Sequence, residues 1–143
     1  MTAHPIRFFA DDEAIRRVGE GLLARTLPKS EWTHEAHIAA ILWLIRDRPD
    51  IDVDADIAGI ISNYNVATGV VNDASHGYHE TITCCYLDAA RKVSARLVGL
   101  SLADTVNQLL SAPEGRRDWP LRLYSRERLM SVAARRAYLP PDL

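Results

Sequence analysis

Apolar residues recur every three or four positions along most of this chain, which is the spacing of one face of an α-helix. Short stretches rich in Pro, Gly, Asn or Asp separate the periodic segments and mark their ends. The predicted helices lie at about residues 12–23, 30–47, 53–68, 78–98, 101–110 and 125–133. The second is expected to start at Ser30 or Thr33, both good caps, and the fifth at the capping residue Ser101. No segment alternates in the way a strand of useful length does. The pattern therefore predicts an all-α protein, an irregular bundle of five to six helices.

Outside the helices, the periodicity is lost in three places. These are an extended lead-in at residues 1–9, an irregular stretch at 112–124 and an irregular tail at 136–143. In the lead-in, Ile6, Phe8 and Phe9 are expected to pack against the helical body, and His4 is expected to face solvent. Pro140 and Pro141 are expected to end the ordered part of the chain.

Length and charge narrow the class of protein. A chain of 143 residues is expected to form a single domain, residues 1–143. Its net charge of −2 argues against a general nucleic-acid binder. The longest apolar run, Ile38 to Ile45, is too short to span a membrane. Cys84 and Cys85 are adjacent in a helical pattern and form no disulfide framework, so we expect small core residues and a cytoplasmic location.

Histidines occur on the apolar faces of two predicted helices. His34 and His37 share a stripe with Ile38 and Ile41 in the second helix. In the fourth helix, His79 starts the inward stripe that continues through Thr83 and Tyr86. These imidazoles are therefore expected to face the interior rather than open solvent.

Helix order predicts that the two histidine segments meet. Short connections make successive helices antiparallel, so the second and fourth helices should begin at the same end of the bundle, where the third helix ends. A polar pocket is expected there. The residues proposed to line it or to act in it are Trp32, His34, His37, Tyr64, Asn65, Tyr78, His79, Glu80 and Thr83, with Glu35 and His76 nearby.

Three kinds of chemistry suit such a pocket. His34, His37 and His79 could bind a divalent metal ion such as zinc, iron or manganese. Alternatively, His79 and Glu80 could transfer a proton, with Tyr78 and Thr83 orienting a substrate. As a third possibility, the helix N-termini could bind a small polar or anionic ligand.

A local excess of positive charge supports the anionic ligand. Residues 113–143 contain seven arginines and four acidic residues, a balance of +3. These arginines either pair with the acidic body or form an anion-facing patch. The rival hypothesis, from another class, is a structural or interaction protein in which the His–Glu cluster only holds the second and fourth helices together. Catalysis and oligomeric state stay open.

Several motifs together resemble a group of uncharacterised bacterial all-helical proteins. The first is Trp32-Thr33-His34-Glu35-Ala36-His37, and the second is Gly77-Tyr78-His79-Glu80-Thr81-Ile82-Thr83. The resemblance spans roughly residues 30–143 and includes a segment like Tyr124-Ser125 followed by Leu129-Met130-Ser131, then a Pro-Asp-Leu tail. It implies that His34, His37, His79 and Glu80 belong to the shared pattern. It implies no activity.

Overall fold

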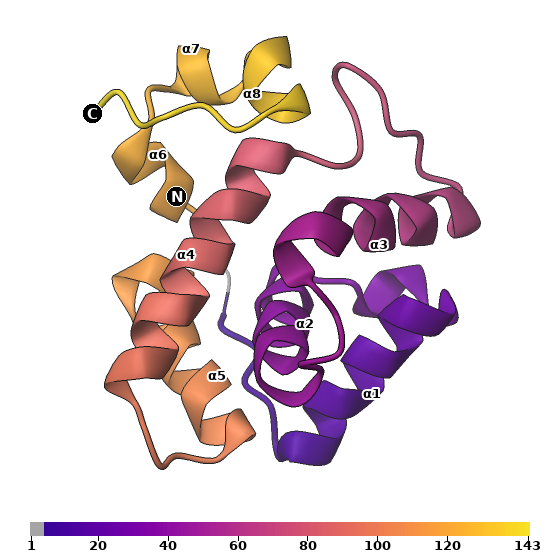
Figure 1. Cartoon of the computed structure of the whole chain (residues 1–143), viewed down its shortest axis with the longest axis vertical. Coiled ribbons are helices and arrows are strands. Elements are labelled where there is room, and N and C mark those ends of the chain that lie inside the picture. Colours follow the sequence, from indigo (N-terminus) through magenta and orange to yellow (C-terminus); the bar gives the residue numbers. More distant parts are fainter. Residues whose placement is uncertain (1–4) are drawn as a thin grey trace.

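The computed structural model describes residues 5–143, and within that range the chain is all-helical (Figure 1). Residues 1–4, including His4, lie outside the described part. Five longer helices come first: α1 (Asp12–Ala24), α2 (His34–Asp47), α3 (Val53–Ala67), α4 (Glu80–Arg96) and α5 (Leu102–Ser111). Three short ones follow: α6 (Trp119–Leu123), α7 (Arg126–Leu129) and α8 (Val132–Arg136). Single turns of 3-10 helix, η1 (Lys29–Glu31) and η2 (Pro113–Gly115), precede α2 and α6.

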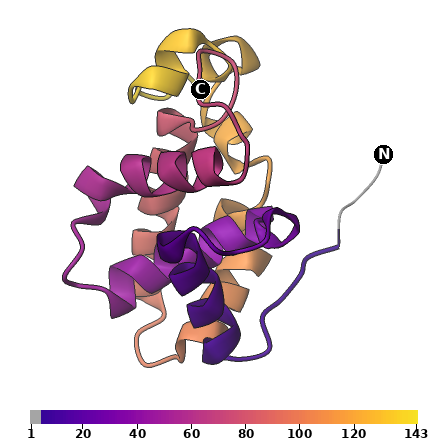
Figure 2. The same ribbon diagram turned by 90° about the vertical axis from the view of Figure 1, so that its right-hand side faces the viewer.

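Helix α2 forms the centre of the core. It is buried continuously from Ala36 to Leu44, apart from His37. α1, α4 and α5 pack around it (Figures 1 and 2). α1 can approach closely because Gly19 faces the Trp43 ring, where an added Cβ would lie only 2.1 Å from a ring carbon. No helix of residues 5–143 is long and apolar enough to cross a membrane.

Helix α3 departs from the antiparallel order that the sequence predicts. It lies roughly across the direction of α4 in both side views (Figures 1 and 2). A loop of twelve residues, 68–79, joins the two helices and does not force them to run side by side. α3 instead packs on α1, and the Tyr64 hydroxyl donates a hydrogen bond of 2.8 Å to the Leu27 carbonyl.

The prediction for the C-terminal quarter was partly wrong. Residues 119–123, expected to be irregular, form α6. The single helix expected at 125–133 is two helices, because Ser125 and Ser131 each accept a hydrogen bond from a backbone N–H three residues later. A second capping serine starts a new helix with a new direction.

The tail was also expected to lack order after Pro140, and it is instead held along the body. Thr81 is fully buried, and its hydroxyl donates to the Ala137 carbonyl (2.9 Å) and accepts from the Leu139 N–H (3.1 Å). Further along, the Asp142 carboxylate accepts hydrogen bonds from the Ser125 N–H (2.8 Å) and hydroxyl (2.7 Å).

Hydrogen bonds and apolar contacts attach the described part of the lead-in to the helical body. The Asn107 amide exchanges two hydrogen bonds of 2.9 Å with the Phe9 backbone. Ile6 and Phe9 pack against the core as expected. Phe8 does not, since its side chain is exposed.

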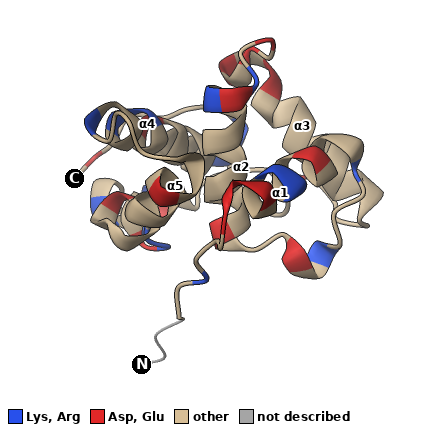
Figure 3. Cartoon of the chain, turned by 90° about the horizontal axis from the view of Figure 1, so that it is seen from below, with Lys and Arg blue, Asp and Glu red and all other residues tan. Residues whose placement is uncertain are grey.

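Charged residues are spread over the surface rather than gathered. Acidic and basic positions are interspersed over the elements seen in Figure 3. The C-terminal arginines mostly have partners in the fold: Arg135 donates to the Gly77 carbonyl (2.9 Å) and Arg128 to the Pro140 carbonyl (2.8 Å). Both of these acceptors are backbone carbonyls, and among residues 5–143 Arg117 alone of the C-terminal arginines pairs with an acidic side chain of the preceding body, Glu35.

Candidate functional site

Two adjacent cavities lie where α2, α3, α4 and the C-terminal helices meet. The first has a volume of about 390 Å³ and the second about 470 Å³. They share one wall, made by His37, Ile61, Ile82, Thr83 and Met130. The first cavity also contains His34, Ile41, Tyr86, Arg117, Pro120, Leu121 and Leu129. The second also contains Trp32, Asn65, Val70, Gly77, Tyr78, His79 and Arg135.

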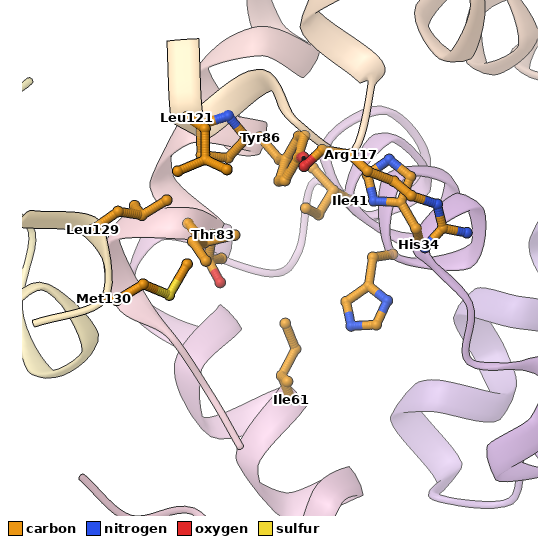
Figure 4. A pocket seen from close by; sticks show the side chains of 12 residues that line it. His34, Ile41, Ile61, Thr83, Tyr86, Arg117, Leu121, Leu129 and Met130 are labelled. Carbon is orange, nitrogen blue, oxygen red and sulfur yellow. Dashed lines mark hydrogen bonds between the residues drawn. The ribbon is translucent and has the colours of Figure 1, made fainter. Parts of the chain in front are cut away.

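The first cavity is mainly apolar, with polar groups at a few points. Figure 4 shows Leu121, Leu129 and Met130 on one side of the space and Arg117 and His34 on the other. Thr83 points into the space between them, and Ile61 lies across from it. This is the usual composition of a small-molecule pocket.

The start of α2 fixes the ring of His37. Thr33 caps the helix through its hydroxyl, and its carbonyl oxygen lies 2.7 Å from Nδ1 of His37. A carbonyl only accepts, so Nδ1 carries the proton and Nε2 keeps its lone pair. The ring also stacks on Trp32, with ring centroids 3.7 Å apart. Burial lowers the pKa of His37 to about 4, which keeps the imidazole neutral.

Nε2 of His37 is available to a ligand. It has no hydrogen-bond partner among residues 5–143, and it is not among the fully enclosed unpartnered atoms of that range. The ring lines both cavities, so this nitrogen is an accessible acceptor at their shared wall.

His34 is held on the opposite side of the first cavity from Thr83. Its Nε2 donates a hydrogen bond of 2.8 Å to the Gly115 carbonyl, and its ring meets the edge of Tyr86. Gly115 can lie here because it has no Cβ; an added one would be 2.0 Å from the Leu109 carbonyl oxygen. Burial lowers the pKa of His34, so this ring is also neutral and its Nδ1 is unprotonated.

His79 has a different role from the other two. It is the N-cap of α4, and its Nδ1 accepts a hydrogen bond of 3.1 Å from the Ile82 N–H. Its Nε2 donates a bond of 2.8 Å to the Leu129 carbonyl. Burial lowers its pKa. Both ring nitrogens are therefore used within the protein, and no lone pair is free for a metal ion.

The expected His79–Glu80 pair is not formed. Glu80 accepts a short hydrogen bond of 2.6 Å from the Tyr78 hydroxyl and a weak one of 3.6 Å from the Cys84 thiol. It lines neither cavity. Tyr64 does not line them either, because its hydroxyl is bonded deep in the core. Burial, together with the negative charge of Glu80, raises the pKa of Cys84 to about 12, so this cysteine stays a thiol.

The other predicted site residues do come together. Trp32, Asn65, Tyr78, His79 and Thr83 line the second cavity with His37, and His34 joins His37 in the first. The predicted meeting of the two histidine segments therefore occurs, although α3 does not run in the expected direction. Among residues 5–143, however, no three His, Cys, Asp or Glu side chains are grouped as a metal site requires.

Some residues of the site carried no signal in the sequence. Arg117 reaches the first cavity from residues 112–124, which show no helical periodicity, and Met130 reaches it from the last predicted helix, which was not expected to face the site. Arg117 lies 3.6 Å from Oε1 of Glu35, whose residue is only 3% exposed. That oxygen is enclosed and has no hydrogen-bond partner among residues 5–143. The sequence therefore does not indicate that Arg117 lies between the cavity and Glu35.

Comparison of the chain with models of protein families, with curated proteins and with solved structures finds no match. The resemblance to the group of uncharacterised bacterial proteins thus stays a prediction.

Proposed function

We propose that this protein binds a small organic ligand in the first cavity, with Nε2 of His37 as the polar contact. The observation that supports this most directly is the state of His37. Its ring is largely buried and neutral, it is oriented by Thr33 and Trp32, and its one acceptor has no partner in residues 5–143. This nitrogen is an accessible acceptor on a largely apolar wall, so a ligand that brings a donor can form a hydrogen bond there.

The size of the space supports the same proposal. A cavity of about 390 Å³ falls within the roughly 300–1,000 Å³ range of ligand pockets. Its largely apolar wall and few oriented polar groups suit a compact organic molecule better than a hydrated ion.

For His79 we propose a structural role. Its two hydrogen bonds support the rival hypothesis for this one residue, but the helix that it connects to α4 is α7 and not α2. His79 thus connects two helices, whereas His37 is the proposed contact to the ligand. We do not propose a metal ion for this site, since one of its three expected ligands has no free nitrogen.

Nuclear magnetic resonance of the labelled protein, with a library of small organic fragments, tests the proposal. We expect some fragments at millimolar concentration to shift the amide signals of Ile41, Thr83 and Met130. Ile61→Phe, which places a larger side chain at the cavity wall, should abolish these shifts. Val66→Phe is the matched control, because Val66 is exposed on the same helix.

Two results would contradict the proposal. One is a folded protein whose cavity amides respond to no fragment. The other is a response that is equal in Ile61→Phe and in Val66→Phe, since binding would then take place elsewhere.

A further inference from the structure

We infer the class of ligand from the polar groups of the first cavity: a compact apolar acid that also carries one hydroxyl or N–H donor, such as a hydroxylated aromatic carboxylate. The donor would bond to Nε2 of His37 and the carboxylate would pair with Arg117. This inference rests on the proposed function, because it names the ligand of the same cavity.

The inner wall of the cavity presents acceptors and almost no donors. His37 carries its proton on the nitrogen that bonds to Thr33, and His34 on the nitrogen that bonds to Gly115. In each ring the other nitrogen is a bare lone pair. Both rings are neutral, since burial lowers the pKa of each.

The two hydroxyl groups of the wall, on Thr83 and Tyr86, already donate their protons to backbone carbonyls. Thr83 donates to the His79 carbonyl at 2.8 Å, one turn back in the chain. Tyr86 donates to the Arg116 carbonyl at 2.7 Å. Each oxygen retains lone pairs but has no second proton to offer. A ligand satisfies such a wall only by bringing a donor of its own.

The one cation of the first cavity is Arg117. Its side chain is about half exposed, so it lies toward solvent and not in the apolar interior. The guanidinium makes no hydrogen bond to residues 5–143, and its nearest carboxylate oxygen, on Glu35, is 3.6 Å away. The guanidinium therefore pairs with Glu35 by charge alone, and its N–H donors, which this separation leaves without a good hydrogen bond, can bind a ligand carboxylate.

The rest of the wall defines the body of the ligand. Branched aliphatic side chains (Ile41, Ile61, Ile82, Leu121 and Leu129) enclose the space between the polar groups. Met130 is flexible and its sulfur packs well against aromatic rings. A bare anion such as phosphate would leave this apolar surface unused, and a cation would meet the charge of Arg117.

Calorimetric titration with a matched set of probes tests the inference. The set contains the ortho, meta and para isomers of hydroxybenzoate, benzoate without the hydroxyl, phenol without the carboxylate, methoxybenzoate with the donor blocked, and inorganic phosphate. We expect at least one hydroxybenzoate to bind about tenfold more tightly than benzoate, phenol and methoxybenzoate. A tenfold difference in affinity is about the contribution of one buried hydrogen bond.

Variants then assign the two contacts. His37→Phe should bring the preferred hydroxybenzoate down to the affinity of benzoate. Arg117→Gln should weaken hydroxybenzoate about tenfold and phenol far less. If Arg117→Gln does not fold because Glu35 loses its neighbour, the double variant Glu35→Gln/Arg117→Gln replaces it.

The outcomes separate this inference from the proposed function. Fragments that shift the cavity amides without any preference for hydroxyl or carboxylate would overturn the ligand class and leave the proposed function standing. Phosphate binding as tightly as hydroxybenzoate would also overturn the class. Cavity amides that respond to no probe would overturn both.

Discussion

The imidazole of His79 at the start of α4 donates a hydrogen bond to the backbone carbonyl of Leu129 at the end of α7, across fifty residues of sequence. The same ring caps its own helix by accepting from the Ile82 N–H. One neutral side chain therefore starts α4 and holds the C-terminal segment against it. This segment supplies Leu129 and Met130 to the wall of the first cavity.

Replacing His79 should destabilise the fold. His79→Ala removes a helix cap and leaves the buried Leu129 carbonyl without its donor, so we expect a loss of about 2 to 3 kcal/mol in the free energy of unfolding. His79→Asn should recover about half of that loss, because asparagine is a good N-cap but cannot reach Leu129. Urea unfolding followed by circular dichroism measures each value.

His76→Ala is the control for this comparison. His76 lies three residues earlier in the loop, and its side chain is largely exposed. We expect its substitution to change stability by less than about 0.5 kcal/mol. Equal effects at His76 and His79 would contradict the assigned role of His79.

Stability should fall as the solution is acidified below neutral pH. The pKa of His37 is about 4 in the folded protein and near 6.5 when unfolded, so the unfolded chain binds more protons between these values. Stability is then greatest above pH 6.5 and decreases as the pH drops toward 4. The pKa difference corresponds to at most about 3 kcal/mol for this residue. Lowered pKa values at His34 and His79 act in the same direction.

His37→Asn removes the titrating group and tests its share. Urea midpoints measured at several pH values between 4 and 7 should depend less steeply on pH in this variant than in the unmodified protein. An identical pH dependence in both would show that His37 is not neutral and buried in solution.

Removing Arg117 alone should destabilise the protein more than removing Arg117 together with the charge of Glu35. Arg117→Ala leaves the enclosed Glu35 carboxylate without a nearby positive charge. We expect a loss of about 1 to 2 kcal/mol, less than for a fully buried pair because Arg117 is half exposed. Adding Glu35→Gln to Arg117→Ala should restore most of the lost stability. Thermal unfolding of the unmodified protein, the two single variants and the double variant measures this. A double variant less stable than Arg117→Ala alone would contradict this account.

Thr81 should control the attachment of the tail. Thr81→Val keeps the shape of the side chain but removes the bonds to Ala137 and Leu139. We expect a loss of about 1 to 2 kcal/mol and faster hydrogen exchange at the Leu139 amide. Thr83→Val is the control, because the His79 carbonyl that it serves retains its bond from the Thr83 N–H. Equal exchange rates at Leu139 in the two variants would contradict the role of Thr81.

Much of the fold could be predicted because it is local. The periodic apolar stripe and the capping residue Thr33 predict α2 closely, and Ser101 does the same for α5. The direction of α3 depends on how a long loop packs, and no local pattern encodes that. The split between α7 and α8 did have a local signal in Ser131, but the apolar spacing across it resembled one continuous helix.

The site could be predicted only where its residues lie on helix faces. His34 and His37 belong to a readable stripe, and both line the first cavity. The role of His79 depends on which atoms face its two nitrogens, and one of those atoms, on Leu129, is fifty residues away. Arg117 follows the single turn η2, where no periodicity indicates the direction of a side chain.

The C-terminal wall of the first cavity is synthesised last, so the cavity closes late in folding on the ribosome. Ribosomes synthesise α1 to α5 first, so His34, His37 and Thr83 can be in place while the first cavity still lacks one side. Leu129 and Met130 close that side only after they emerge, together with the tail that Thr81 holds. The first cavity is thus the last part of the described fold to be completed. A protease cut between α6 and α7 would leave the five long helices intact, and Leu129 and Met130 would then stay at the cavity through non-covalent contacts such as those of His79 and Thr81.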